Sequence, residues 1–465
     1  MRRVLLAILL LAPLRGVIAQ QLVVGVDQRV ELLSLVFRLA GAPEYSDGSI
    51  RGYAEAADRH FAAHREHEVV RMARALRADH GVSFDAVMSM AVHLSPFPTL
   101  GERTPFESAG STLDPRWPPA KARLFAEALR RFVRDADVAG FFAAQHVVTD
   151  SANARLRRMV AERVDPSWFE RFFATPGGER FVLVPGLLNG GGSFGPSVSP
   201  REGSTELWAI IGTWNSDSAG LPVFPEALGS TIAHEFAHSF INKVVARHRS
   251  AYEGFAPTYD QVATVMRAQS YGNWKTVVDE SLVRATTVAW ARANLSDSLA
   301  TVVMNSERSR GFVWAGELAD SLAVWRTRRA GRPWLDEGSA EVGAWFGSLT
   351  SRVVAMNAAF DALRPRIVSS SIASGATNVD PATTTFTVTF DRPMVVGWSV
   401  GGAGDAKRPQ FAQPGFSPDR RTWTVRITLE PATDYGFSLN GPLGGGFRTP
   451  EGVALARSEV RFRTR

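Results

Sequence analysis

The chain has 465 residues, 45% of them apolar and 21% charged, which is the composition of a globular protein long enough for more than one domain. It contains no cysteine, which excludes a disulfide framework, a thiolate metal ligand and a cysteine nucleophile. The net charge of +6 comes from arginine-rich segments spread along the chain, without interleaved aromatic residues, so nucleic-acid binding is not predicted.

Residues 1–19 have the pattern of a signal peptide. Arg2 and Arg3 precede an apolar run from Val4 to Leu14, and this run is too short for an ordinary membrane span. Cleavage is expected before Gln20, which predicts an exported protein, either periplasmic or secreted. The alternative is an uncleaved membrane anchor.

The next part of the chain, to about residue 175, is predicted to be mostly helical. A short strand is expected at Leu22–Val26. Apolar periodicity then predicts helices at Arg51–Leu76, Lys121–Val133, Ala152–Val164 and Ser167–Phe173.

Two β-rich apolar runs follow, Arg180–Pro185 and Leu207–Trp214, and predict strands. The glycine-rich segment 190–195 between them contains a literal G-x-G-x-x-G. Because Pro196 and Pro200 follow, no helix can start there, and a dinucleotide site is not predicted. The segment is expected to form a plain hairpin turn or an edge strand beside the active site, which could pair with an extended peptide.

A metal-binding helix is predicted around residues 230–240. His234 and His238 are four residues apart and therefore lie on one helical face, where two imidazoles can share a zinc ion. Glu235 can reach a water molecule at the metal without being a ligand. Apolar residues surround this His-Glu-x-x-His pattern, as in a buried helix whose polar residues need partners. The alternative is a core helix with two hydrogen-bonded histidines.

A catalytic zinc site needs a third protein ligand, and two downstream glutamates are candidates. Glu280 lies in a helical pattern, with Arg284 one turn further along the same face. Glu337 lies in the segment Trp334–Ala340, which looks like the zinc-ligand segment of glutamate-zincin aminopeptidases. Because Pro333 and Gly338 flank Glu337 closely, Glu280 is favoured. Either glutamate could instead be an ordinary surface carboxylate.

The span from about Val26 to Leu349 resembles an uncharacterised bacterial family with an HExxH helix, known only as a domain of unknown function. The matching stretches are Glu31–Tyr45, Tyr53–Val69, His234–Phe240, and Tyr271–Trp274 leading into Glu280–Ala285. The resemblance implies a gluzincin-like metallopeptidase fold, α+β and mostly helical with a small mixed sheet. It also implies that His234, His238 and Glu280 hold zinc and that Glu235 is the general base.

The expected chemistry is hydrolysis of a peptide bond by a zinc-activated water, with Glu235 taking the proton of the water and passing it to the leaving amine. A further donor is needed for the oxyanion. Tyr271 and Arg284 are candidates for this role or for substrate contacts, although Tyr271 is also typical of a packed core tyrosine.

Residues 366–465 are predicted to be an all-β domain, after a linker at Leu363–Arg366. Short alternating runs predict strands at Ile367–Ser371, Thr384–Phe390, Trp423–Leu429, Tyr435–Leu439 and Glu459–Arg463. The strings 374–379, 390–394 and 460–464 resemble the bacterial Ig-like domains of surface-layer proteins. The resemblance implies a sandwich with a role in spacing, attachment to the cell envelope or substrate capture.

The sequence thus predicts three parts: a signal peptide at 1–19, a zincin-like metallopeptidase domain at 20–362 and an Ig-like domain at 366–465. The predicted function is that of an exported zinc metallopeptidase acting on a peptide or protein. The alternatives are a cell-envelope binding protein that holds metal without turnover, and a zinc amidase acting on non-protein amides.

Overall fold

The computed structural model describes residues 22–46, 50–108, 111–175, 178–200, 203–441 and 445–465. The predicted signal peptide lies outside these residues. The described chain is about half helical, with small sheets and a strand-rich C-terminal part. It divides into two compact units, one up to Phe240 and one from Ile241. The linker predicted at Leu363–Arg366 therefore lies inside the second unit. Among the described helices, none is both long enough and apolar enough to cross a membrane.

The first unit is built on a bundle of helices around one apolar core. The first of them, α2, begins after Asp27, whose carboxylate accepts a hydrogen bond from the backbone amide of Arg29 as an N-cap. Side chains from α2, α4, α5 and α6 fill the core together with residues of three strands. The helices of this unit are α2 (Gln28–Leu39), α3 (Arg51–His60), α4 (Glu68–His80), α5 (Asp85–His93), α6 (Pro119–Asp135), α7 (Val138–Ala144), α8 (His146–Arg163) and α9 (Ser167–Phe173).

The helix predicted over Arg51–Leu76 is instead broken into α3 and α4. A 3-10 turn at Ala62–His64 separates them, and His67 caps α4 through its ring nitrogen, which accepts from the amide of Val69. The break turns the ring of Phe61 into the core, where it is fully buried. Tertiary packing therefore interrupts a run whose apolar spacing favours one continuous helix.

The sheet of the first unit has the strand order β1-β2-β4-β3 and is mixed. Strands β1 (Leu22–Val24), β2 (Arg180–Gly186) and β4 (Glu206–Gly212) are parallel, and β3 (Ser197–Val198) is antiparallel to β4. Every residue of β4 is buried, as expected for a strand covered on both faces. The glycine-rich segment leads into the edge of this sheet, since Phe194 and Ile210 exchange two backbone hydrogen bonds of 2.8 and 2.9 Å.

Helix α10 (Leu228–Arg247) runs across the boundary between the two units and is followed by the helices of the second unit. These are α11 (Ala256–Arg267), α12 (Trp274–Asn294), α13 (Asp297–Ser309), α14 (Ala315–Arg328), α15 (Trp334–Glu337), α16 (Ser339–Ser348) and α17 (Val353–Asp361). Asn273 caps α12 and Ser296 caps α13. Around α12 this unit packs α13 and α14, and most residues of α12 are buried.

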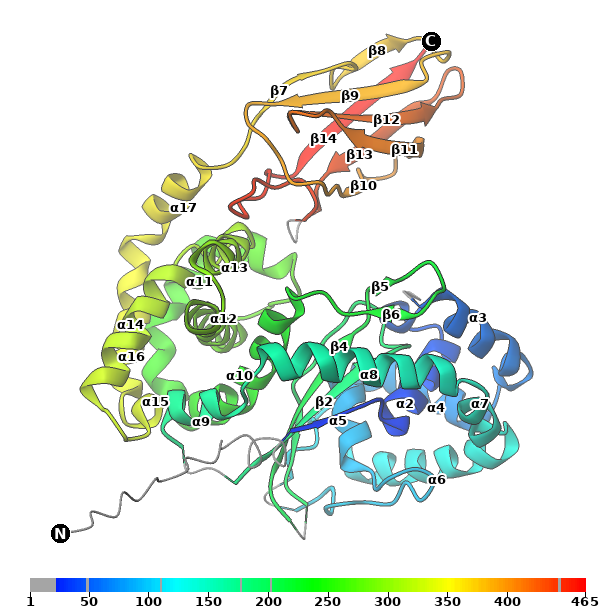
Figure 1. Cartoon of the computed structure of the whole chain (residues 1–465), viewed down its shortest axis with the longest axis vertical. Helices are drawn as coiled ribbons and strands as arrows, with labels where there is room; N and C mark the ends of the chain where they lie inside the picture. The colour runs from blue at the N-terminus through cyan, green and yellow to red at the C-terminus, as the bar shows by residue number, and fades with distance from the viewer. Residues whose placement is uncertain (1–21, 47–49, 109–110, 176–177, 201–202, 442–444) are drawn as a thin grey trace, which may run out of the picture. The chain divides into compact units, whose positions relative to one another are not determined.

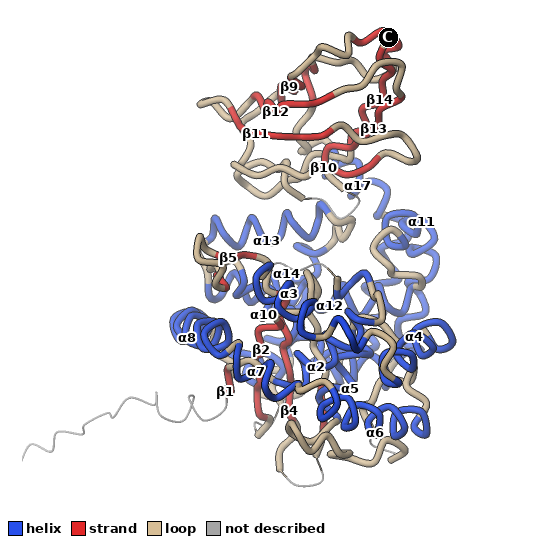
Figure 2. Tube along the Cα trace, turned by 90° about the vertical axis from the view of Figure 1, so that its right-hand side faces the viewer, coloured by secondary structure: helices blue, strands red, loops and turns tan. Residues whose placement is uncertain are grey.

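The C-terminal strands form two four-stranded sheets, with orders β10-β13-β14-β8 and β11-β12-β9-β7. Figure 2 shows these strands gathered near the C terminus, after a stretch of the chain that is mostly helical. Side chains of both sheets meet in one core, as in the edge-to-face pair of Phe386 and Phe437 at 5.1 Å. The strands are β7 (Ile367–Ser370), β8 (Ala376–Val379), β9 (Thr385–Phe390), β10 (Val400–Gly402), β11 (Gln410–Phe416), β12 (Thr422–Thr428), β13 (Asp434–Leu439) and β14 (Ser458–Thr464).

All five predicted C-terminal strands are present, and β8, β10 and β11 were not predicted. Strand β11 contains Pro414 and a register shift between Ala412 and Gly415, which hides its alternation. Hydrogen bonds connect the segment after α17 with the β-rich part and with α13. Arg364 donates to the carbonyl of Ala454 at 2.9 Å, and the amide of Ala454 donates to Ser309 at 3.0 Å. The β-rich part is therefore attached to α13 by hydrogen bonds as well as by the chain.

Candidate metal centre

Helix α10 is held in the first unit by aromatic side chains on its buried face. Phe240 stacks on Phe173 of α9 with the ring centroids 5.0 Å apart, and Phe236 meets Phe181 of β2 edge-on, also at 5.0 Å. These contacts use the apolar stripe that the sequence places every four residues along the helix. In Figure 1 both α9 and α10 are drawn in green shades beside the end of the sheet. The packing fixes the rotation of α10 and hence the direction of its histidines.

The two histidines of α10 face each other. Nε2 of His238 lies 3.2 Å from Nε2 of His234, and the ring centroids are 4.9 Å apart at an angle of 79°. Two nitrogens bound to one tetrahedral zinc at 2.0–2.1 Å would be separated by about 3.3 Å. The observed separation thus matches what a shared zinc ion requires. Both side chains are partly exposed.

Glu235 is buried, with 6% of its surface exposed. The glycine-rich segment lies directly against the backbone of α10 at this point. A Cβ atom on Gly195 would come within 2.3 Å of the Glu235 carbonyl oxygen. Only glycine fits at such a distance. The structure therefore explains one glycine of the segment by close backbone packing beside the metal-binding helix.

The third candidate ligand that joins the histidines is Glu280 of α12. Ligand atoms of His234, His238 and Glu280 all lie within 4.8 Å of one another, and Glu280 is buried. The group could hold a metal ion. Two imidazole nitrogens and one carboxylate oxygen are a donor set that zinc accepts, with a fourth position left for water or substrate.

Glu337 has a different environment. It is exposed at the end of the short helix α15, and its carboxylate pairs with Arg332 at 2.6 Å. It is not a member of the group that could hold a metal. Its neighbour Asp336 accepts hydrogen bonds from Arg247 and His248, at 2.8 and 2.5 Å. The segment 334–340 therefore contributes an ion-pair cluster near the end of α10.

Arg284 orients Glu280 from one turn further along α12. Its Nη2 donates to Glu280 at 3.0 Å and to the Tyr271 hydroxyl at 2.8 Å. The guanidinium lies 4.4 Å from the centre of the Phe312 ring, a cation–π distance. With its side chain 4% exposed, Arg284 is enclosed between the two acidic groups and the rings.

Glu307 of α13 is the residue that the sequence reasoning missed. It pairs with Nη1 of Arg284, and it is 7% exposed. Burial would raise the pKa of Glu307, but Arg284 and Arg310 hold it below the ordinary value. In the same way burial disfavours the charge of Arg284, yet Glu307 and Glu280 keep its pKa above the usual range. The sequence carried little signal for this role, because Glu307 is one of two carboxylates on α13 and lies far along the chain from Glu280.

Tyr271 is also part of this network. Burial raises the pKa of Tyr271 to about 12, and the charge of Glu280 acts in the same direction. Because Arg284 donates to its hydroxyl oxygen, the hydroxyl proton of Tyr271 is directed elsewhere. Tyr271 and Arg284 were predicted as substrate or oxyanion contacts. The geometry places both beside Glu280, and Arg284 is committed to the two glutamates.

Comparison with known proteins assigns the chain to a family. A family model described as a domain of unknown function, DUF4932, matches residues 22–341. No curated protein matches the chain.

Two solved structures of a surface-layer protein match, "Structure of surface layer protein SbsC, domains 1-6" and "Crystal structure of the S-layer protein rSbsC(31-844)". They are 19% and 20% identical over 50% of this chain, and each has a TM-score of 0.17. The match spans 33% of each of those chains.

Proposed function

We propose that this chain, which belongs to DUF4932, a family described as a domain of unknown function, is a zinc-dependent metallopeptidase. The observation that carries the proposal is the group of His234, His238 and Glu280, with the two imidazole nitrogens at the separation that a tetrahedral zinc ion needs. The gluzincin-like fold and the Ig-like character of the C-terminal sheets belong to the same proposal.

A zinc ion held by these residues would supply a Lewis acid that activates water and polarises a substrate carbonyl. Glu235, next to His234 on the same helix, takes the proton of the attacking water. It then passes that proton to the amine that leaves.

The remaining residues position these groups. Arg284 fixes the carboxylate of Glu280 and is itself fixed by Glu307, and such support keeps a ligand in one orientation.

The test is hydrolysis by the zinc-loaded full chain, measured on casein and on a library of quenched fluorescent peptides. Glu235→Gln should keep the metal and lose roughly 10²–10⁴-fold in rate, the usual contribution of a general base. Glu337→Gln, a carboxylate change outside the group, is the matched control and should keep full activity. A Glu235→Gln variant as active as the parent would overturn the mechanism.

Two other classes remain as outcomes of the same experiment. Hydrolysis of small acyl amides but not of casein or peptides would identify a zinc amidase. Zinc bound at one ion per chain without hydrolysis of any of these substrates would favour a cell-envelope binding protein. Export, predicted from residues 1–19, is tested by the N-terminal sequence of the protein recovered outside the cytoplasm.

A further inference from the structure

A pocket lies in the first unit, at the start of helix α2 and apart from the candidate metal ligands. Its volume is about 380 Å³, which is within the range of small-molecule sites. It is formed by the first turn of α2, by α3, and by segments around residues 96 and 142–153. Its lining comprises Val26, Asp27, Gln28, Arg29, Glu31, Tyr53, Pro96, Phe97, Phe142, Thr149 and Asn153.

Two of its lining residues, Glu31 and Tyr53, carry buried polar atoms that interact with each other without a well-formed hydrogen bond. Glu31 and Tyr53 are each 1% exposed. The Oε1 atom of Glu31 accepts a hydrogen bond of 2.7 Å from the amide of Leu187. Within the described chain neither Oε2 of Glu31 nor the hydroxyl of Tyr53 makes a hydrogen bond of normal geometry. Buried polar atoms almost always make well-formed hydrogen bonds, so this loosely paired carboxyl and hydroxyl have hydrogen-bonding capacity left for a third group.

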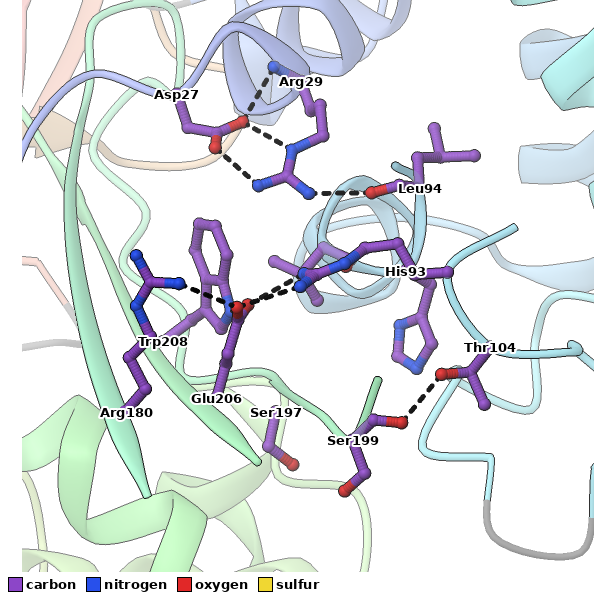
Figure 3. Close-up of polar contacts among 12 residues, drawn as sticks. Asp27, Arg29, His93, Leu94, Thr104, Arg180, Ser197, Ser199, Glu206 and Trp208 are labelled. Carbon is purple, nitrogen blue, oxygen red and sulfur yellow. Dashed lines mark hydrogen bonds and ion pairs between the residues drawn. The ribbon is translucent and has the colours of Figure 1, made fainter. Parts of the chain in front are cut away.

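The positive charge nearest in the sequence is not available to Glu31. Arg29 donates to both oxygens of Asp27, at 2.9 and 2.6 Å, and to the carbonyl of Leu94 at 2.7 Å, as Figure 3 shows. Its guanidinium also lies 5.1 Å from the centre of the Trp208 ring. Arg29 and Asp27 therefore neutralise each other.

The surroundings of Glu31 favour an incoming cation. Burial raises the pKa of Glu31 to about 7, and the negative charge of Asp27 acts in the same direction, whereas the Leu187 amide and Tyr53 oppose them. The titratable groups around it are thus Tyr53 on α3, and Asp27 with its paired Arg29 at the start of α2. A carboxylate so placed gains more from a cation than an exposed one does, because little water screens the pair.

The rest of the wall is aromatic. Phe97 and Phe142 meet edge-on with the ring centroids 5.5 Å apart, and both line the pocket. Aromatic faces attract organic cations, and a carboxylate nearby adds a charged hydrogen-bond acceptor for the ammonium group. Acid, hydroxyl and rings together form the kind of site that takes an alkylammonium group.

We propose that this pocket binds a small organic cation bearing an ammonium group, which Glu31 and Tyr53 hold by hydrogen bonds while Phe97 and Phe142 cover its alkyl part. The pocket contains none of the candidate metal ligands. The proposal therefore does not depend on the metallopeptidase function, and either can fail without the other.

The experiment titrates the full chain with butylammonium chloride and follows the backbone amides of residues 26–31 and 187–188 by NMR. Butanol and sodium butyrate serve as neutral and anionic probes of the same size. The variants are Glu31→Gln and Tyr53→Phe. Glu170→Gln is the matched control, because Glu170 is another carboxyl whose pKa burial raises, and it lies outside the pocket.

Butylammonium should bind more tightly than butanol or butyrate. Glu31→Gln should weaken it by about tenfold or more, the loss expected for a charged hydrogen bond, and Glu170→Gln should not. Tyr53→Phe should weaken it as well, which provides a second variant if Glu31→Gln fails to fold. Equal binding of butanol, tighter binding of butyrate, or no shift of these amides by any probe would each overturn the proposal.

Discussion

Two buried glutamates on helices, Glu280 and Glu31, show how differently one side chain can behave at similar burial. Glu280 is 9% exposed and lies against Arg284, which balances its charge. Glu31 is 1% exposed, accepts from the backbone amide of Leu187 and has only the uncharged Tyr53 hydroxyl as a side-chain partner, with a pKa of about 7. The first has an arginine as its ion-pair partner and belongs to the group that could hold a metal ion. The second can hold its proton near neutral pH.

Glu307, the other buried partner of Arg284, has its pKa held below the ordinary value by Arg284 and Arg310 despite its burial, so the partner, more than burial, decides the state of a carboxyl. A buried carboxylate beside an arginine stays charged because the Coulomb attraction offsets lost hydration. Without a cation the same burial favours the neutral acid. Each of the following substitutions changes one of these glutamates or its ion-pair partner.

The largest effect is expected from removing the ligand glutamate. Glu280→Ala should lower zinc from one ion per chain to none, because two histidines alone bind zinc too weakly to retain it through dialysis. Elemental analysis of the dialysed protein measures this. Two control variants should each retain one zinc: Glu31→Ala, which changes the other glutamate of the comparison, and Glu337→Ala, which changes the alternative ligand candidate. Zinc retained by Glu280→Ala and lost by Glu337→Ala would move the site to segment 334–340.

Arg284→Met should cost about 3–5 kcal/mol of unfolding free energy, because it leaves Glu280 and Glu307 buried without their common cation. Urea denaturation of the metal-free protein measures the loss. Arg332→Met, which removes the exposed partner of Glu337, serves as the control and should cost less than about 1 kcal/mol. Equal losses in the two variants would mean that burial of the network contributes nothing.

Glu31 predicts a pH dependence of stability with a defined sign. The folded carboxyl has a pKa of about 7, against 4.5 for an unperturbed one, so the folded state holds a proton that the unfolded chain releases. Stability therefore falls as pH rises from 4.5 to 7, by up to about 3 kcal/mol. Glu31→Gln should remove this loss.

Urea midpoints at pH 5 and pH 8 measure that effect. The parent should lose more stability between the two values than Glu31→Gln does. Glu337→Gln, at an exposed position, should follow the parent. The same pH dependence in parent and Glu31→Gln would show that Glu31 is ionised throughout.

The smallest effect is expected at Glu307, which acts on the metal group only through Arg284. Glu307→Gln should weaken zinc binding by about 10–100-fold, as loss of a residue that orients a ligand commonly does. Competition with a chromophoric chelator measures the affinity. Glu317→Gln, which removes an exposed ion pair with Arg352, is the control and should not change it. An unchanged affinity in Glu307→Gln would limit Glu307 to a structural role.

Local patterns in the sequence determined the helix with His234, Glu235 and His238, and most of the strands in both units. Four-residue spacing places two side chains on one face of any helix, whatever surrounds it, and alternation marks a half-buried strand in the same local way. The prediction of one continuous helix over residues 51–76 was wrong, because packing of Phe61 into the core depends on tertiary contacts that local spacing does not encode.

Only the tertiary structure decided which distant carboxylate meets the histidines. The local pattern favours Glu280 but leaves Glu337 as an alternative. The packing of α12 among its neighbours brings Glu280 into the group while Glu337 stays exposed. The same holds for Glu307 and for the pocket of Glu31 and Tyr53, whose members come from separate helices. Contacts between residues of separate helices depend on how the helices pack together, and the periodicity within one helix does not encode them.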